Sequence, residues 1–137
     1  MNRLSIGVFL LAMAGCGTKL SYIPLNTSPK ALTARDPNTV EMFTSSKPER
    51  PFVEVGLIEA QQESAYSVDG ETSVFSKMRQ EAASRGCDGL VVTGGNDAVV
   101  GQTSGRAGFT TTLRGYRATC IVYKDINSSR TAEAADK

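Results

Sequence analysis

Residues 79–93 read RQEAASRGCDGLVVT, and this stretch decides the fold. Upstream of it and within it, apolar residues recur at helical spacing and predict an amphipathic helix whose buried stripe consists of Val74, Phe75, Met78 and Ala82. Gly86 is the expected end of this helix, because a left-handed backbone conformation costs glycine little. The apolar run Leu90-Val91-Val92 follows and predicts a short strand that is buried on both faces.

Two strands are predicted before the helix. Residues 52–60 read FVEVGLIEA, an alternation that is expected to place Val53, Val55 and Leu57 on one face of a strand. Gly56 interrupts this run and predicts a β-bulge or close packing under the helix. Residues 40–44 alternate over a shorter stretch and predict a first strand.

The segment after the predicted buried strand is rich in glycine. Residues 94–115 contain six glycines, which favours either a long mobile loop or an irregular hairpin extension. A loop of this length in a small domain is often functional, so the candidate binding residues of the segment are Asn96, Asp97, Arg106 and Phe109. Residues 116–123 then predict the last strand, in which one face carries Tyr116, Ala118, Cys120 and Val122.

The predicted order of elements is strand, strand, helix, strand, loop, strand. This order indicates an α+β domain over residues 39–124, in which a single helix packs on a mostly antiparallel sheet of about four strands. Residues 125–137 are polar and rich in alanine, and we expect them to form a disordered tail.

The start of the chain resembles the export signal of bacterial lipoproteins. A short positive segment and an apolar run over residues 6–14 lead into Met13-Ala14-Gly15-Cys16, which is similar to a lipobox. The resemblance implies that residues 1–15 are a signal peptide and that Cys16 is lipidated. The alternative is an ordinary secretory signal with an incidental cysteine. Gly17, in place of aspartate, favours the outer membrane, with the domain facing the periplasm or exposed at the surface.

Residues 16–38 contain three prolines and show no sustained period, so we expect an extended tether between the lipidated cysteine and the domain. The alternative is that part of this segment packs on the domain through Tyr22, Ile23 and Leu25. The formal net charge of +1 and the absence of a basic stripe or an RNA-binding aromatic motif argue against a nucleic acid partner.

The cysteine and histidine content limits the chemistry. If Cys16 carries lipid, Cys87 and Cys120 remain as a candidate disulfide pair in an oxidising envelope, and two buried free thiols are the alternative. The chain has no histidine, and therefore lacks the commonest general base and the commonest metal ligand. Two cysteines are too few for a structural zinc site. We therefore expect no cofactor, no metal site and no enzymatic activity.

The arrangement of elements, with GCDGLVVT at 86–93 and RATCIVY at 117–123, resembles RcsF-like envelope lipoproteins and the YbjQ-like small α/β domains. The resemblance implies a lipid-anchored binding or sensing domain with an envelope protein as partner. One difference is that RcsF-type domains hold four cysteines in two disulfides, whereas this domain has only Cys87 and Cys120. The alternative function is a small-ligand or metal-binding YbjQ-like module, which requires a pocket near Asp88, Asn96 and Asp97.

Overall fold

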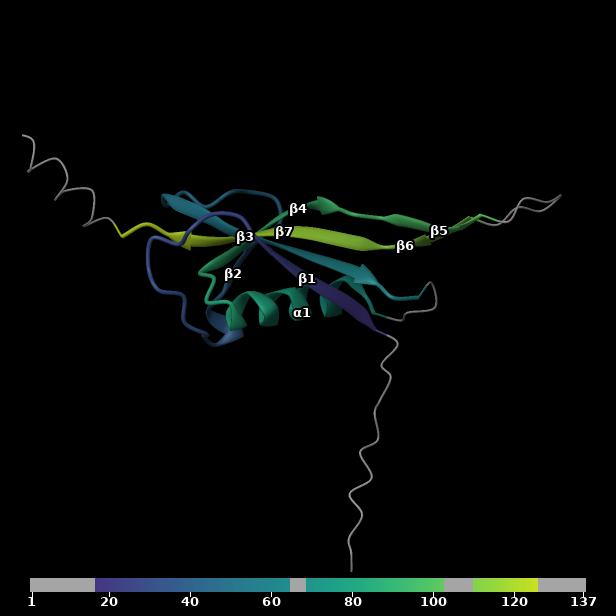
Figure 1. The fold of residues 1–137 in the computed structure, drawn as a ribbon, viewed down its shortest axis with the longest axis horizontal. Helices are drawn as coiled ribbons and strands as arrows, with labels where there is room; N and C mark the ends of the chain where they lie inside the picture. The colour runs from purple at the N-terminus through teal and green to yellow at the C-terminus, as the bar shows by residue number, and fades with distance from the viewer. Residues whose placement is uncertain (1–16, 65–68, 103–109, 126–137) are drawn as a thin grey trace, which may run out of the picture.

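The computed structural model describes residues 17–64, 69–102 and 110–125, and for residues 100–102 it describes the backbone alone. In these ranges one α-helix lies along one face of a five-stranded sheet, and a two-stranded hairpin extends from the end of the sheet (Figure 1). The predicted α+β class, with a single helix on a mostly antiparallel sheet, is confirmed. No helix in the described ranges has the length and apolar character needed to cross a membrane.

The elements follow the chain in the order β1 (Thr18–Pro24), the 3-10 helix η1 (Pro37–Thr39), β2 (Glu41–Phe43), β3 (Phe52–Gln62), α1 (Glu71–Ser84), β4 (Gly89–Gly95), β5 (Ala98–Gln102), β6 (Thr110–Leu113) and β7 (Gly115–Tyr123). The large sheet has the strand order β1-β3-β7-β4-β2. Its neighbours are antiparallel except β2 and β4, which are parallel. The hairpin pairs β5 with β6.

The prediction of an extended tether over residues 16–38 is wrong for residues 18–24. These residues form β1, which pairs with β3 from Thr18 opposite Gln62 to Pro24 opposite Gly56. The structure agrees with the alternative for Tyr22, which packs against the core. It does not agree for Ile23 and Leu25, which are 44% and 47% exposed. The period of β1 is short, and its partner strand is remote in sequence, so the local pattern alone did not identify it.

The prediction for the faces of the strand over residues 52–60 is correct at Val55 and wrong at Leu57. A register shift between Glu54 and Gly56 forms a β-bulge, as Gly56 predicted, and the bulge inverts the alternation after it. Ile58 and Ala60 are therefore buried in place of Leu57. The missing side chain at Gly56 also leaves room for the Tyr22 ring, since a Cβ there would lie 2.3 Å from Tyr22 Cε2.

The main core lies between α1 and the sheet. The helix contributes Val74, Met78, Ala82 and Ala83, and the sheet contributes Val55, Ile58, Leu90, Ala118, Cys120 and Val122. A smaller cluster covers the opposite face at one end of the sheet and contains Val91, Ile121 and Tyr123, with Phe43 and Phe52 packed against them. Strand β7 is therefore buried on both faces, which explains its central place in the sheet.

The helix ends where the sequence predicts. Gly86 has a φ of 78°, and the Cys87 amide donates to the Ala82 carbonyl at 3.0 Å. Arg85 forms an ion pair with Glu81 at 2.9 Å, one turn earlier. The chain then turns directly into β4, in which Leu90 and Val91 are buried.

Candidate functional site

The two domain cysteines form the predicted disulfide. Cys87 and Cys120 are joined with a Cα–Cα distance of 5.7 Å, and both side chains are fully buried. The bond links the turn after α1 to the central strand β7. It is therefore a structural bond in the core rather than an accessible redox centre.

Asp88, the next residue, lies in a cluster of charged groups. Its carboxylate accepts hydrogen bonds from Lys30 Nζ at 2.8 Å, from the Tyr123 amide at 2.9 Å and from Arg35 Nη1. A hollow of about 360 Å³ lies beside this cluster, lined by Lys30, Ala31, Thr33, Ala34, Arg35, Gly86 and Asp88. Both cations pair with the one carboxylate of Asp88, so the cluster fastens residues 30–35 to the end of the helix.

The protonation of the groups at this end of the sheet follows from their surroundings. Burial raises the pKa of Asp88, but hydrogen bonds from Lys30, the Tyr123 amide and Arg35 outweigh burial and lower its pKa overall. Burial, followed by the hydrogen bond that the Tyr123 hydroxyl donates to Glu41, raises the pKa of Tyr123 to about 12. At neutral pH Asp88 is therefore ionised and Tyr123 is neutral.

The hairpin form of the glycine-rich segment is the alternative that the structure contains, with β5 and β6 extending beyond β4 and β7 and away from α1 (Figure 1). Asn96 and Asp97 lie at the base of this hairpin. The Asn96 amide donates to the Gly115 carbonyl at 2.8 Å, and Asp97 Oδ1 accepts from the Gly115 amide at 3.1 Å. Both candidate residues thus hold the base of the hairpin. The other two candidates, Arg106 and Phe109, lie outside the described residues, as does Cys16.

The YbjQ-like alternative requires a pocket near Asp88, Asn96 and Asp97, and the structure does not bring Asp88 together with the other two residues. Asp88 precedes β4 and Asn96 follows it, so the length of a seven-residue strand, roughly 23 Å, separates them. Among the described residues, no group of three or more cysteine, aspartate or glutamate side chains converges in a way that could hold a metal ion.

One edge of β4 is only partly covered by a neighbouring strand. Strand β2 pairs with β4 only from Glu41 opposite Gly89 to Phe43 opposite Val91. On the other edge, β7 accompanies β4 as far as Gly95. Along the edge that faces β2, residues 92–95 therefore have no partner strand in the described part of the chain. We call residues 92–95 the free edge of β4.

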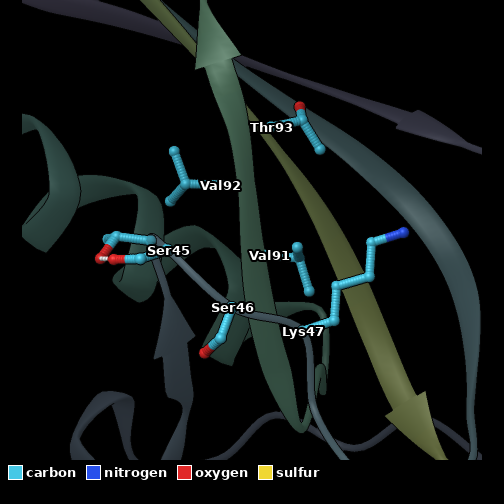
Figure 2. A pocket seen from close by; sticks show the side chains of 7 residues that line it. Ser45, Ser46, Lys47, Val91, Val92 and Thr93 are labelled. Carbon is cyan, nitrogen blue, oxygen red and sulfur yellow. Dashed lines mark hydrogen bonds between the residues drawn. The ribbon is translucent and has the colours of Figure 1, made fainter.

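The first of two hollows lies at this edge, where the chain leaves β2. It measures about 340 Å³ and is lined by Thr44, Ser45, Ser46, Lys47, Val91, Val92 and Thr93. Figure 2 shows Val91 and Thr93 on one side of β4 and Val92 on the other, with Lys47 beside Val91. We call this space the loop hollow.

The second hollow lies between the helix and the edge of the sheet. It measures about 400 Å³ and is lined by Met42, Thr72, Phe75, Ser76 and Arg79. The four helix residues fall on one face of α1 because they are three or four positions apart. We call this space the helix hollow. Arg79 Nε in its wall is buried and has no hydrogen-bond partner among the described residues.

Sequence reasoning missed both hollows and Arg79. The period of the helix indicates a buried stripe at Phe75 and Met78, but the neighbouring positions 72, 76 and 79 look like an ordinary solvated face. An arginine between two apolar positions of the helix was the available signal, since a long cation near a buried stripe often covers apolar surface with its stem.

The chain was compared with protein families, with curated proteins and with solved structures. No protein-family model matches the chain, and no curated protein matches it. A solved structure that is similar to this chain is the crystal structure of the Francisella virulence factor FvfA in its orthorhombic form. The sequence identity is 16%, the TM-score is 0.41, and the alignment covers 73% of this chain and 96% of that one. A similarity at this level carries no argument about function.

Proposed function

We propose that this chain is a non-catalytic protein-binding module of the bacterial envelope, held at the outer membrane by a lipid on Cys16. The observation that carries the proposal is the free edge of β4, with the loop hollow at this edge and the helix hollow between α1 and the neighbouring strand β2. Unpaired strand edges bind polypeptides through main-chain hydrogen bonds, and adjoining pockets select the side chains.

Two further features support an envelope location. The disulfide between Cys87 and Cys120 is typical of proteins from oxidising compartments. The segment before Cys16 resembles a lipoprotein export signal, and the domain pattern resembles RcsF-like lipoproteins, whose role implies binding or stress signalling through a protein partner.

The anchor is tested by intact mass measurement of the chain extracted from membranes. Acyl groups on Cys16 are the expected result, and a Cys16→Ser variant should be released from the membrane fraction. An unacylated chain in the soluble fraction would remove the envelope part of the proposal.

The partner is tested by site-specific photo-crosslinking in intact cells. A photoreactive residue at Ser46, in the wall of the loop hollow, should capture a defined envelope protein. The same residue at Asn38, which is exposed on η1 away from the hollows, is the control. Equal labelling from both positions, or no product from Ser46, would contradict the proposal.

A further inference from the structure

We propose that the partner contributes an extended, acidic segment that pairs as an added strand with the free edge of β4; this inference rests on the proposed function. The first observation is the early end of β2, whose pairing with β4 stops at Val91. The strand continues to Gly95 and is paired there with β7 on its other side, with a bulge between Val92 and Gly94. Along residues 92–95 the edge that faces away from β7 therefore has no strand beside it in the described part of the chain, and main-chain groups there can pair with another strand.

The second observation is the space at Gly94. This glycine has a φ of 143°, and a Cβ built on it would find no atom within 4 Å. A glycine within a strand often marks a place where another backbone approaches closely. A register shift between Val92 and Gly94 gives the strand a bulge, and Thr93 Oγ1 donates to the Arg117 carbonyl at 3.1 Å. The bulge limits the added pairing to a few residues.

The third observation is the position of the helix hollow. Met42 in its wall lies opposite Leu90, near the start of β4. Phe75 in the same wall packs edge-on against Tyr116 at 5.0 Å, and Tyr116 lies opposite Gly95. These contacts place the helix hollow between α1 and β2, on the helix side of the sheet, whereas the loop hollow, which Val92 and Thr93 line, lies at the free edge itself. Alternate side chains of an added strand point to opposite faces of a sheet, so they would enter the two hollows in turn.

The fourth observation is the charge at the two hollows. Arg79 lies in the wall of the helix hollow and Lys47 in the wall of the loop hollow, and neither forms an ion pair with any residue that the structure describes. Lys30, Arg35, Lys77, Arg85 and Arg117 are all paired with carboxylates. Because neighbouring residues of a strand point to opposite faces, two unpaired cations, one on each side of the edge, are complementary to glutamate or aspartate at neighbouring positions of the added strand.

The opposite edge of the sheet is less suitable. Strand β1 ends at Pro24 and carries an exposed Lys19, and proline and lysine are the residues that protect edges from pairing. None of the three hollows described here is lined by β1. Lys19 therefore provides a matched control. It is an exposed cation without an ion pair in the described chain, and it lies on β1, at the opposite edge of the sheet.

The test uses the full chain purified in detergent and fluorescently labelled octapeptides. The probe carries two neighbouring glutamates among valine and threonine, so that one glutamate points to each face of the added strand. One comparison peptide replaces glutamate with lysine, and another carries a central proline, which cannot pair as a strand. Saturable binding of the acidic probe is expected, with affinity at least tenfold weaker for both comparison peptides. Arg79→Gln and Lys47→Gln should each weaken the acidic probe several-fold, and Lys19→Gln should leave it unchanged.

Amide hydrogen exchange locates the bound peptide. The acidic probe should slow exchange within residues 92–95 and leave β1 unchanged. Equal binding of the lysine peptide, unchanged affinity in Arg79→Gln, or no protection in β4 would overturn the inference. Concentration-dependent dimers that protect the same amides without peptide would also overturn it, in favour of a second copy of the chain. If Ser46 crosslinking to an envelope protein persists in Arg79→Gln with undiminished yield, the proposed function stands and strand addition fails.

Discussion

Gly86 lies so close to Thr33 that a Cβ built on the glycine would be 2.7 Å from the Thr33 amide nitrogen. The segment before η1 therefore crosses directly over the end of α1, and the Arg35 amide donates to the Ala83 carbonyl at 3.0 Å. This contact joins a stretch without strand structure to the turn that carries Cys87 and Asp88. The glycine is required twice here, for its positive φ and for its missing side chain.

We expect Gly86→Ala to destabilise the domain by about 2–3 kcal/mol, because it combines backbone strain with a clash against main-chain atoms. Urea unfolding followed by circular dichroism measures the change. Gly95→Ala is the matched control, since its Cβ would meet nothing closer than 3.7 Å and its φ is not in the positive range. Equal losses in both variants would contradict the close contact with Thr33.

The disulfide should contribute roughly 3–4 kcal/mol to the free energy of unfolding, because it closes a loop between residues 33 positions apart. Unfolding in urea with and without dithiothreitol measures this contribution. A Cys87→Ala, Cys120→Ala double variant serves as the control, and its stability should not respond to the reductant. A wild-type midpoint that is unchanged by complete reduction would refute the prediction.

Asp88 should make stability depend on pH in the acidic range. Because folding lowers its pKa from 3.8, its contribution is present above that value and is lost as the pH falls through the lower pKa of the folded state. Asp88→Asn should cost about 2 kcal/mol at pH 7, since it removes charge-assisted bonds to Lys30 and Arg35. Chemical unfolding between pH 2 and pH 7 should show a shallower acid loss in the variant. A curve parallel to that of the wild type would count against this assignment.

Tyr123 should give the opposite dependence at high pH. Its pKa is raised to about 12, so its contribution to stability is complete below the ordinary value of 10.0 and is lost as the pH rises toward 12. Absorbance near 295 nm reports phenolate formation, and Tyr123→Phe should remove a component that titrates close to pH 12. Wild-type and variant titrations of identical shape at that end would exclude a raised pKa at this residue.

The sequence was sufficient for the helix, its glycine end, the disulfide and the strands over residues 52–60 and 116–123. These features depend on local period or on a residue pair with few alternatives. The bulge at Gly56 was predicted, but its consequence for Leu57 was not, because a local alternation gives no sign of where an inverted register begins to apply.

Two features could not be predicted from the sequence, for a common reason. They are strand β1 and the free edge of β4. Each depends on which strands become neighbours, and strand order is decided by contacts between distant segments. The place of Arg79 in the helix hollow could not be predicted for the same reason. Arg79 and Met42 line one hollow because β2, which carries Met42, pairs with β4. The carboxylate of Asp97, one of the predicted binding residues, has a structural role, because it accepts a hydrogen bond from the Gly115 amide at the base of the hairpin.

The pairing of β1 also sets the distance between the domain and any anchor on Cys16. Gly17 is the one residue between that cysteine and the first residue of β1, and the Glu63 amide donates to its carbonyl at 3.0 Å. One extended residue spans only about 3.5 Å. A lipid on Cys16 would therefore hold this domain against the bilayer surface, with little freedom to turn or to travel, and a partner would have to come to the membrane to meet it.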